Sequence, residues 1–536
     1  MAVWLTWPLT LKATTDLPDP AGFPADILSA AWLLAWHTHA LTTNPALILH
    51  PNAFHPAPFS LFYAPPALGP LPIFAPAYIA SGSVPFAYAY AFLGGLALAG
   101  LGVAEVVRRW TGCPEAGFLA GLVLITSPTI LGSPGTAPLC AMLAGLPWLV
   151  HGGAQRRLGS SASAGFVGAL VLQGLVDPIF AMAAALIPLG AIACVRLARR
   201  ATRRDGWRLT SRISLACAIL SPLLLGYLAA WHGLDPGPGP SALATKLIES
   251  DAGTRVALLL MLQPTLQGLP VELTWRHLAL VAGGALLAAQ RRTLLAPGWR
   301  HAALWTAVGL GYSFLFVPLY LQLVLRHPEL LDRLAPLRNL HRLTNDMLVS
   351  LPLLLGLAAA ELFHRLNALG RLTSISRALV AAVITFVVLS DAAPQLPYRT
   401  VAAPSIPPKL QAVIASAGGP VLELPAVDPV DQAVAMYQSI GGWWPSLNGY
   451  ASFSPPGFVR RMEEAARLPD PETLQRLVAD AGLHTIVVTL LKVPRARRPP
   501  WLAWDALARA GLKRVAYSKG KVIFTVEARP RPLSTP

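Results

Sequence analysis

The sequence predicts a mainly α-helical, polytopic membrane protein: a bundle of about eleven transmembrane helices with a small C-terminal α/β soluble domain. Of its 536 residues, 54% are hydrophobic and only 13% are charged, and the mean hydropathy is +0.53. Soluble domains carry about 25% charged residues, so this composition indicates a membrane protein. Apolar runs of helical length recur up to residue 392, and most lysines and arginines before that point stand in short clusters between them.

The predicted helices are apolar runs that approach the length needed to cross a bilayer, about 20 residues. They lie near 84–107, 116–134, 137–151, 162–176, 178–195, 212–231, 277–289, 301–325, 344–363 and 374–392. Residues 1–11 predict the second half of one further helix, and Met1 falls inside that apolar run.

The basic clusters predict the orientation of these helices. Arg108-Arg109, Arg156-Arg157, the arginines between 196 and 212 and Arg291-Arg292 all fall on one side, which is the cytoplasm by the positive-inside rule. The chain is therefore expected in a bacterial inner membrane, with its N-terminus inside and its C-terminal domain outside. Because no basic stripe is interleaved with aromatic residues on a soluble surface, the pI near 10.2 does not indicate nucleic-acid binding.

The first outer loop, 13–83, is more than a connector. Residues 24–43 predict an amphipathic helix in which Trp32 and Trp36 lie in the membrane interface. Proline is then too frequent over 44–76 for a regular spanning helix. Irregular backbone near a bilayer must be buried in protein or line a polar cavity, so this segment is expected to build a cavity on the outer face.

The composition changes after the last helix, which gives four predicted segments. The transmembrane domain covers 1–392, a proline-rich linker 393–410, the outer α/β domain 411–528 and a disordered tail 529–536. Within the outer domain, short apolar runs predict strands at 421–424, 485–491, 513–518 and 521–527. Helical patterns cover about 429–439, 457–467, 471–482 and 501–511.

Asp26 is the first candidate for chemistry, because it stands at the start of the predicted interfacial helix on the outer face. A carboxylate there can take a proton from an incoming hydroxyl or help hold a divalent cation beside a phosphate. The alternative is that Asp26 only caps the helix 27–41. Both interpretations remain open from the residue chemistry.

The layout resembles the GT-C superfamily of polyprenyl-phosphate-sugar glycosyltransferases. The resemblance rests on the first helix, the outer loop with Asp26 and the W-x-x-x-W helix, Asn52 to Pro56, the aromatic-proline stretch 58–76 and the helix ending in Arg108 to Gly112. Related bacterial membrane proteins carry in their outer domain a leucine-proline strand end and an Asn-Gly-Tyr segment. Here these are Leu424-Pro425 and Asn448-Gly449-Tyr450.

The resemblance implies a transferase that moves a sugar from a polyprenyl-phosphate donor to a glycan, lipid or protein acceptor of the cell envelope. In GT-C enzymes the first outer loop carries the catalytic acid, and Asp26 is the matching position. Those enzymes often have paired acids in this loop, whereas Asp26 is followed by Ile27 and Leu28. A divalent cation is therefore compatible with the sequence but not required by it.

A lipid-phosphate donor needs cationic groups near the membrane surface. The outer loop 326–343 supplies Arg338 and Arg342, which are four residues apart and share one face of a helix. Arginine suits forked phosphate binding, so these two are the candidate phosphate ligands. The alternative is that they pair with acids of the same loop or with Asp346.

Three further residues are candidates for binding substrate or metal. His55 lies in the proline loop, Asp177 lies between two spans, and Asp346 lies at the start of the span 344–363. The competing interpretations are packing or hydrogen bonding for His55 and a structural cap for Asp177.

The loop around Trp443, Trp444, Asn448 and Tyr450 is the candidate acceptor or interface loop. Aromatic planes stack on the apolar faces of sugars, and they also dock domains onto a membrane interface. Beyond the enzyme, two alternatives stay open: a transporter or lipid-handling protein, and a non-catalytic assembly partner. The spans carry few charges and the polar features gather on the outer face, which favours the enzyme.

Overall fold

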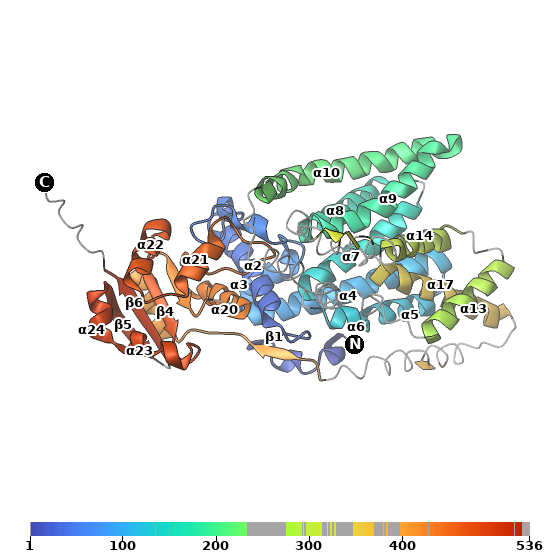
Figure 1. Cartoon of the computed structure of the whole chain (residues 1–536). Coiled ribbons are helices and arrows are strands. Elements are labelled where there is room, and N and C mark those ends of the chain that lie inside the picture. The colour runs from blue at the N-terminus through green and yellow to red at the C-terminus, as the bar shows by residue number, and fades with distance from the viewer. Residues whose placement is uncertain are drawn as a thin grey trace. The chain divides into compact units, whose positions relative to one another are not determined.

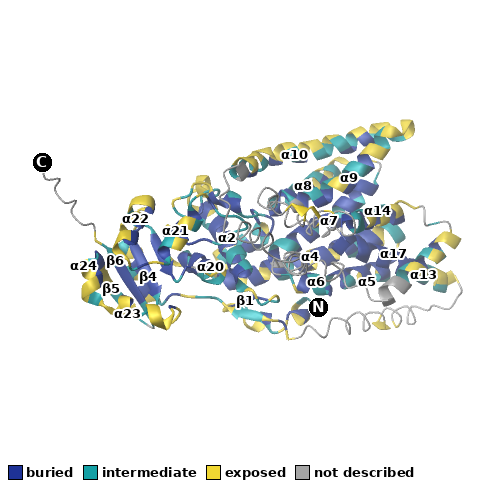
Figure 2. Ribbon diagram, viewed as in Figure 1, coloured by how far each residue is buried: buried dark blue, intermediate teal, exposed yellow. Residues whose placement is uncertain are grey.

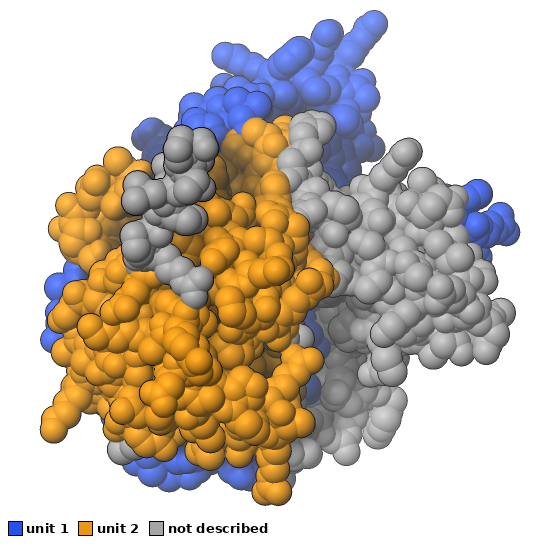
Figure 3. Space-filling view, turned by 60° about the vertical axis from the view of Figure 1, so that its left-hand side comes forward, with its two compact units in different colours: residues 1–14, 66–225, 238–400 blue, residues 15–65, 226–237, 401–536 orange. Residues whose placement is uncertain are grey.

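The computed structural model describes residues 2–133, 136–155, 157–232, 275–312, 347–368 and 397–527, except positions 292, 294, 295, 427 and 519, together with a few isolated residues between 319 and 383. The chain forms two compact units, which Figure 3 colours separately. The first unit comprises 1–14, 66–225 and 238–400, and the second comprises 15–65, 226–237 and 401–536.

Five helices in the described part of the chain are long and apolar enough to cross a membrane. They are α4 (Val84–Thr111), α7 (Thr136–Ala154), α9 (Phe180–Ala198), α10 (Arg203–His232) and α17 (Met347–Ala368). The prediction of a multi-pass helical protein is therefore confirmed.

Shorter apolar helices accompany these long ones. They are α3 (Leu71–Ser81), α5 (Pro114–Ile125), α8 (Ser160–Val176), α13 (Trp275–Gln290) and α14 (Pro297–Gly311). Most of the predicted span 374–392 and the second half of 301–325 lie outside the described residues. The number of about eleven spans therefore stays a prediction.

Helix α17 is the central element of the first unit, and Figure 2 shows it almost wholly buried. It packs against α5, α13 and α14. Buried Thr306 donates a hydrogen bond to the Ser350 hydroxyl across the α14–α17 contact (2.9 Å). Helices α4 and α5 approach so closely that a Cβ on Gly121 would lie 2.5 Å from the Gly100 carbonyl oxygen. Small residues at such contacts allow close packing in a medium without a hydrophobic driving force between helices.

Two predicted segments differ from the structure. Residues 1–11 form the short helix α1 (Ala2–Leu5) and a 3-10 turn (Leu9–Leu11), not half of a span. The predicted helix 116–134 ends at Ile125 and resumes as α6 (Pro128–Leu131), because Pro128 has no N–H to donate to the helix ladder. Within the proline-rich segment, α3 forms despite its internal Pro76.

The second unit contains the C-terminal sheet (Figure 1). Strands β3 (Val421–Leu424) and β4 (Thr485–Thr489) pair in parallel, and β6 (Lys521–Val526) pairs antiparallel with both β4 and β5 (Leu512–Ser518), giving the order β3-β4-β6-β5. The predicted α/β fold class of this part is confirmed.

Helices surround this sheet close to their predicted positions. They are α20 (Pro429–Gln438), α21 (Phe458–Ala465), α22 (Pro471–Ala481), α23 (Pro499–Leu502) and α24 (Trp504–Arg509). Helix α19 (Pro408–Ala417) begins inside the expected proline linker, and its Leu410 and Ile414 pack into the same core as Trp444. The expectation of a linker to residue 410 therefore misses the start of a helix.

Helix α2 (Pro24–Thr43) has the predicted bounds, but its tryptophans do not face outward. Trp32 and Trp36 are only 4% and 5% exposed, because α2 packs against α20 within the second unit. The expected interfacial position of these two side chains is therefore wrong: they contribute to a protein core.

The segment 52–55 extends the C-terminal sheet beyond β3. Backbone hydrogen bonds join residues 445–447 to Val421 of β3. On the other side, the Phe54 N–H donates to the Asn448 carbonyl (3.0 Å) and the His55 N–H to the Ser446 carbonyl (2.8 Å). The proline loop therefore satisfies its backbone by pairing with the C-terminal part of the chain.

The Asn448 side chain locks this extension in place. It is fully buried, its Oδ1 accepts from the Glu423 N–H (2.7 Å), and its Nδ2 donates to the Glu423 carbonyl (3.0 Å). Asn448→Ala leaves both backbone groups buried without a partner, so we expect a loss of about 2 kcal/mol or more of unfolding free energy. Thermal unfolding of the full chain in detergent measures this loss.

The exposed Gln475 on α22 provides the matched control. Gln475→Ala removes a similar amide at the surface, and we expect little change in the unfolding midpoint. Equal midpoints for the two variants would contradict the structural role of Asn448.

Candidate functional site

The candidate site lies in the second unit, where the first turn of α2 meets the segment that comes after Asn448. Asp26 is the third residue of α2 and is partly buried. The Tyr450 hydroxyl donates a hydrogen bond to Asp26 Oδ1 (2.7 Å). Among the described residues, Asp26 Oδ2 has no hydrogen-bond partner. The Tyr450 phenol therefore holds Oδ1 of Asp26, and Oδ2 is available to accept a hydrogen bond or a proton.

Several contacts fix Tyr450 in this position. Its backbone carbonyl accepts from the Ser29 hydroxyl (3.2 Å), and its N–H donates to the Met436 sulfur (2.7 Å). Its ring meets Phe23 edge-on, with centroids 6.4 Å apart. Tyr450 is held by its backbone, its ring and its hydroxyl. It can therefore position the Asp26 carboxylate before a substrate binds, so that little entropy is lost when the substrate binds.

The capping interpretation of Asp26 does not describe this geometry. Helix α2 starts at Pro24, and its N-cap residue Phe23 makes no side-chain capping hydrogen bond. Asp26 lies within the first turn, where the positive end of the helix dipole stabilises an anionic carboxylate. Its hydrogen bond is directed to Tyr450 and not to the backbone amides of α2.

A small cavity lies beside Tyr450. Its lining includes Ser29, Trp32, Phe54, Met436 and Tyr450, and its volume is about 10 Å³. Residues of the proline loop contribute to this cavity, which has room for about one water molecule. A sugar needs a larger space. The expected cavity on the outer face stays a prediction.

Trp443 stacks on α2. Its ring lies parallel to the His39 imidazole with centroids 4.5 Å apart, and it meets Trp36 edge-on at 5.5 Å. Burial lowers the pKa of His39, which favours the neutral ring in this stack. Trp443 is thus docked on protein, and neither a sugar nor a membrane is needed to explain its position.

The other two residues of the candidate loop have core positions. Trp444 is 5% exposed and packs with Val421, Val487 and Ile523 between the sheet and α19. Asn448 is fully buried against β3. Neither side chain is accessible for stacking on an acceptor, so Tyr450 is the residue of this loop that reaches Asp26.

His55 lies in the sheet extension, close to Arg461 of α21. Burial lowers its pKa, the positive charge of Arg461 lowers it further, and a hydrogen bond to the Ala481 backbone opposes both effects. His50, its neighbour in the proline loop, accepts a hydrogen bond from the Phe59 N–H (3.3 Å) and packs on the Phe59 ring. Both histidines thus have structural contacts within the second unit.

The remaining candidates are not brought to Asp26 by any described contact. Asp177 lies in the first unit, and its Oδ1 accepts from the Ile179 N–H (3.0 Å) in the turn between α8 and α9, as a structural cap does. Arg338, Arg342 and Asp346 lie outside the described residues. The described part of the chain contains no group of three or more His, Cys, Asp or Glu side chains arranged to hold a metal ion.

Sequence reasoning missed the link between Asp26 and Tyr450. The two residues are 424 positions apart, and Tyr450 was a candidate only for binding an acceptor or a membrane. Periodic sequence patterns report on one helix or strand, so they carry no signal for a contact between residues so far apart.

Comparisons with known proteins give similarity of layout at low identity. No protein-family model matches the chain, and no curated protein matches it closely enough to count as a relative. The crystal structure of ArnT from Cupriavidus metallidurans is similar in the apo state (12% identity, TM-score 0.38, covering 98% of this chain and 97% of that one). The same protein bound to undecaprenyl phosphate gives 12% identity, TM-score 0.39 and coverage of 98% and 96%.

The oligosaccharyltransferase of Archaeoglobus fulgidus, solved in complex with Zn and sulfate, is also similar (11% identity, TM-score 0.37, covering 98% of this chain and 73% of that one). Because the TM-scores are below 0.5, the similarity carries no information about activity.

The lowered pKa of His55 gives a pH-dependent stability. The unfolded chain binds a proton at about pH 6.5, whereas the folded chain binds it only at lower pH. The unfolded state therefore binds more protons between these values, and stability falls as the pH drops below about 6.5. We expect His55→Gln to lose less thermal stability than the wild type between about pH 7 and pH 5. Parallel losses in both proteins would contradict this assignment.

Proposed function

We propose that the chain is a membrane glycosyltransferase that moves a sugar from a polyprenyl-phosphate donor to an acceptor of the cell envelope. The observation that supports this most strongly is the partly buried Asp26 carboxylate, with Oδ1 held by Tyr450 and Oδ2 without a partner among the described residues. The donor class is the one that the sequence resemblance implies. The transmembrane helices are consistent with a substrate carried by a lipid.

Asp26 acts as the general base in this proposal. Its Oδ2 takes the proton of the acceptor hydroxyl as that oxygen forms a bond to the anomeric carbon of the sugar. The bond between this carbon and the donor phosphate breaks on the opposite side, so the configuration inverts. Polyprenyl phosphate leaves with the bonding electrons, and the proton remains on Asp26.

The donor phosphate needs positive charge, and Arg338 and Arg342 are the proposed ligands. Two guanidinium groups can form forked hydrogen bonds to the phosphate oxygens and stabilise the charge that grows on the leaving group. A divalent cation would be the alternative source of this stabilisation: Asp26 would help to hold it, and the cation would supply positive charge to the donor phosphate. Chelation by EDTA distinguishes the arginines from a divalent cation. Transfer activity that survives EDTA would mean that the arginines stabilise the donor phosphate.

The first test is transfer of labelled sugar from a panel of polyprenyl-phosphate sugars by the purified full-length protein. Asp26→Asn keeps the shape and the hydrogen bond from Tyr450 but cannot accept the proton. We expect its rate to fall by about 10² to 10⁴-fold. Asp505→Asn, an exposed carboxylate on α24, is the matched control with unchanged rate. Full activity of Asp26→Asn would remove Asp26 from the mechanism.

A second variant tests the role of Tyr450 as a positioning residue. Tyr450→Phe removes the hydroxyl that holds Oδ1 and retains the ring contacts. A hydrogen bond to a charged group contributes about 1.5–3 kcal/mol, so we expect kcat to fall about tenfold or more with little change in acceptor KM. Tyr517→Phe, at an exposed tyrosine of β5, is the control. An unchanged kcat, or a change confined to KM, would contradict positioning.

A non-catalytic role in lipid handling or envelope assembly is the second candidate. The small cavity beside Tyr450, with a volume of about 10 Å³, favours it because this cavity has room for about one water molecule and not for a sugar. Absence of transfer across the whole donor panel, by protein that retains its cooperative unfolding, would favour this candidate over the enzyme.

A further inference from the structure

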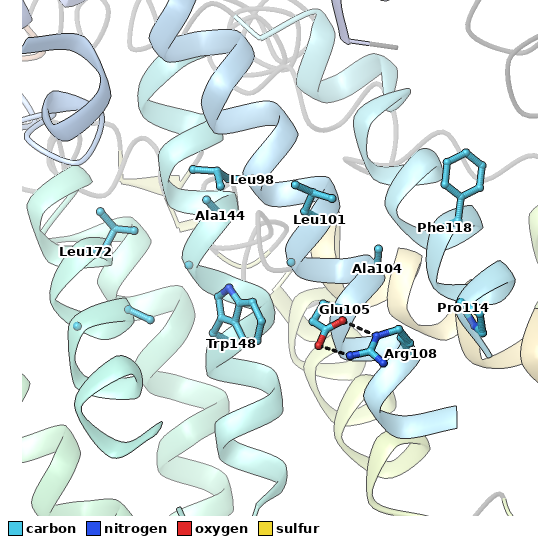
Figure 4. A pocket seen from close by; sticks show the side chains of 14 residues that line it. Leu98, Leu101, Ala104, Glu105, Arg108, Pro114, Phe118, Ala144, Trp148 and Leu172 are labelled. Atoms are coloured by element: carbon cyan, nitrogen blue, oxygen red, sulfur yellow. Dashed lines mark hydrogen bonds and ion pairs between the residues drawn. The ribbon is translucent and has the colours of Figure 1, made fainter. Parts of the chain in front are cut away.

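The first unit carries a large apolar groove that the proposed reaction does not use. It is lined by residues of α4, α5, α7 and α8 and has a volume of about 740 Å³. Figure 4 shows Leu98, Ala144 and Leu172 toward one end, and Trp148 with the Glu105–Arg108 pair toward the other. The groove therefore has an apolar body and a charged, aromatic end.

The depth of the groove corresponds to one leaflet of a bilayer. Leu98 and Arg108 both line it and are ten positions apart on α4, which at 1.5 Å per residue is about 15 Å. The hydrocarbon core of a bilayer is about 30 Å thick. An acyl chain that starts at the arginine end would thus run through the groove to about the bilayer midplane.

The charged end of the groove carries a net positive charge. Arg108 and Arg109 both bond to Glu105, at 2.6 and 2.7 Å, so three charged side chains leave one positive charge uncompensated. The two arginine side chains are 55% and 49% exposed, and their remaining N–H groups have no other hydrogen-bond partner among the described residues. Glu105 orients both guanidinium groups in a fixed position.

Trp148 marks the membrane interface at this end. The Arg109 guanidinium lies over its ring at 5.4 Å from the centroid. Tryptophan and arginine concentrate where lipid headgroups meet the hydrocarbon core. The order from Leu98 to Trp148 and Arg108 therefore matches the order from acyl chain to phosphate in a phospholipid.

We propose that this groove is a binding site for an anionic phospholipid of the leaflet on the arginine side. One acyl chain lies between Leu101, Phe118 and Leu172, and the phosphate contacts Arg108 and Arg109. The net charge selects an anionic headgroup over a zwitterionic one of the same chain length. The site is independent of the transfer reaction proposed above.

Retention of lipid tests the site directly. The full-length protein is placed in nanodiscs of equal phosphatidylglycerol and phosphatidylethanolamine, released, and weighed by native mass spectrometry. We expect the wild type to retain phosphatidylglycerol in preference to phosphatidylethanolamine. Arg108→Gln/Arg109→Gln removes the charged contacts, and we expect retained phosphatidylglycerol to fall about tenfold and the preference to disappear.

A second variant fills the groove without disturbing the fold. Gly168 lines the groove, and a Cβ added there meets no atom within 4 Å. Gly168→Leu is therefore expected to fold and to lower retention of both lipids. Gly190 on α9 is equally open but does not line the groove, so Gly190→Leu is the matched control with wild-type retention.

Three results would overturn the proposal. Equal retention by Gly168→Leu and Gly190→Leu would mean that the groove holds no lipid. Lower lipid retention by Gly168→Leu, together with an unchanged preference for phosphatidylglycerol in Arg108→Gln/Arg109→Gln, would mean that the groove binds lipid without selecting an anionic headgroup. A dimer mass in the wild type that Gly168→Leu abolishes would assign the groove to a second copy of the chain.

Discussion

The backbone pairing between residues 52–55 and 446–448 supports the candidate site and much of the second unit. It joins a proline-rich loop near the start of the chain to the C-terminal sheet, and the buried amide of Asn448 holds the pairing against β3. Proline prevents this loop from forming a helix ladder, so its polar backbone groups must find partners elsewhere. Two distant parts of the chain therefore fold as one unit.

This constraint determines the surroundings of Asp26. Once Asn448 is fixed, Tyr450 is two residues away and its hydroxyl reaches the first turn of α2. Burial of Trp32 and Trp36 against α20 keeps α2 in place, which makes the carboxylate part of a rigid element and not of a loop. Such preorganisation suits a general base, whose effect depends on a fixed distance to the proton that it takes.

The first unit obeys a different physical rule. Its helices approach closely where glycines meet, as at Gly100 and Gly121, and its core helix α17 is almost fully buried. Long apolar faces elsewhere remain exposed, as on α10, which Figure 2 shows exposed along much of its length. Its Leu215 and Leu225 are 54% and 64% exposed. In a bilayer such apolar faces contact lipid chains without a cost in free energy. An apolar groove can therefore select one phospholipid headgroup only where charged side chains are added, as we propose for Arg108 and Arg109.

The sequence alone determined the class of this protein and the positions of most elements. Apolar length marked α4, α7, α9 and α17, short apolar runs marked β3 to β6, and the helical pattern of residues 24–43 marked α2. These signals are local, since each depends on residues within one helix or strand. Contacts across hundreds of residues leave no such periodic signal. Only the tertiary structure could therefore decide that Trp444 and Asn448 are buried, that Trp32 and Trp36 face protein, and that Tyr450 holds Asp26.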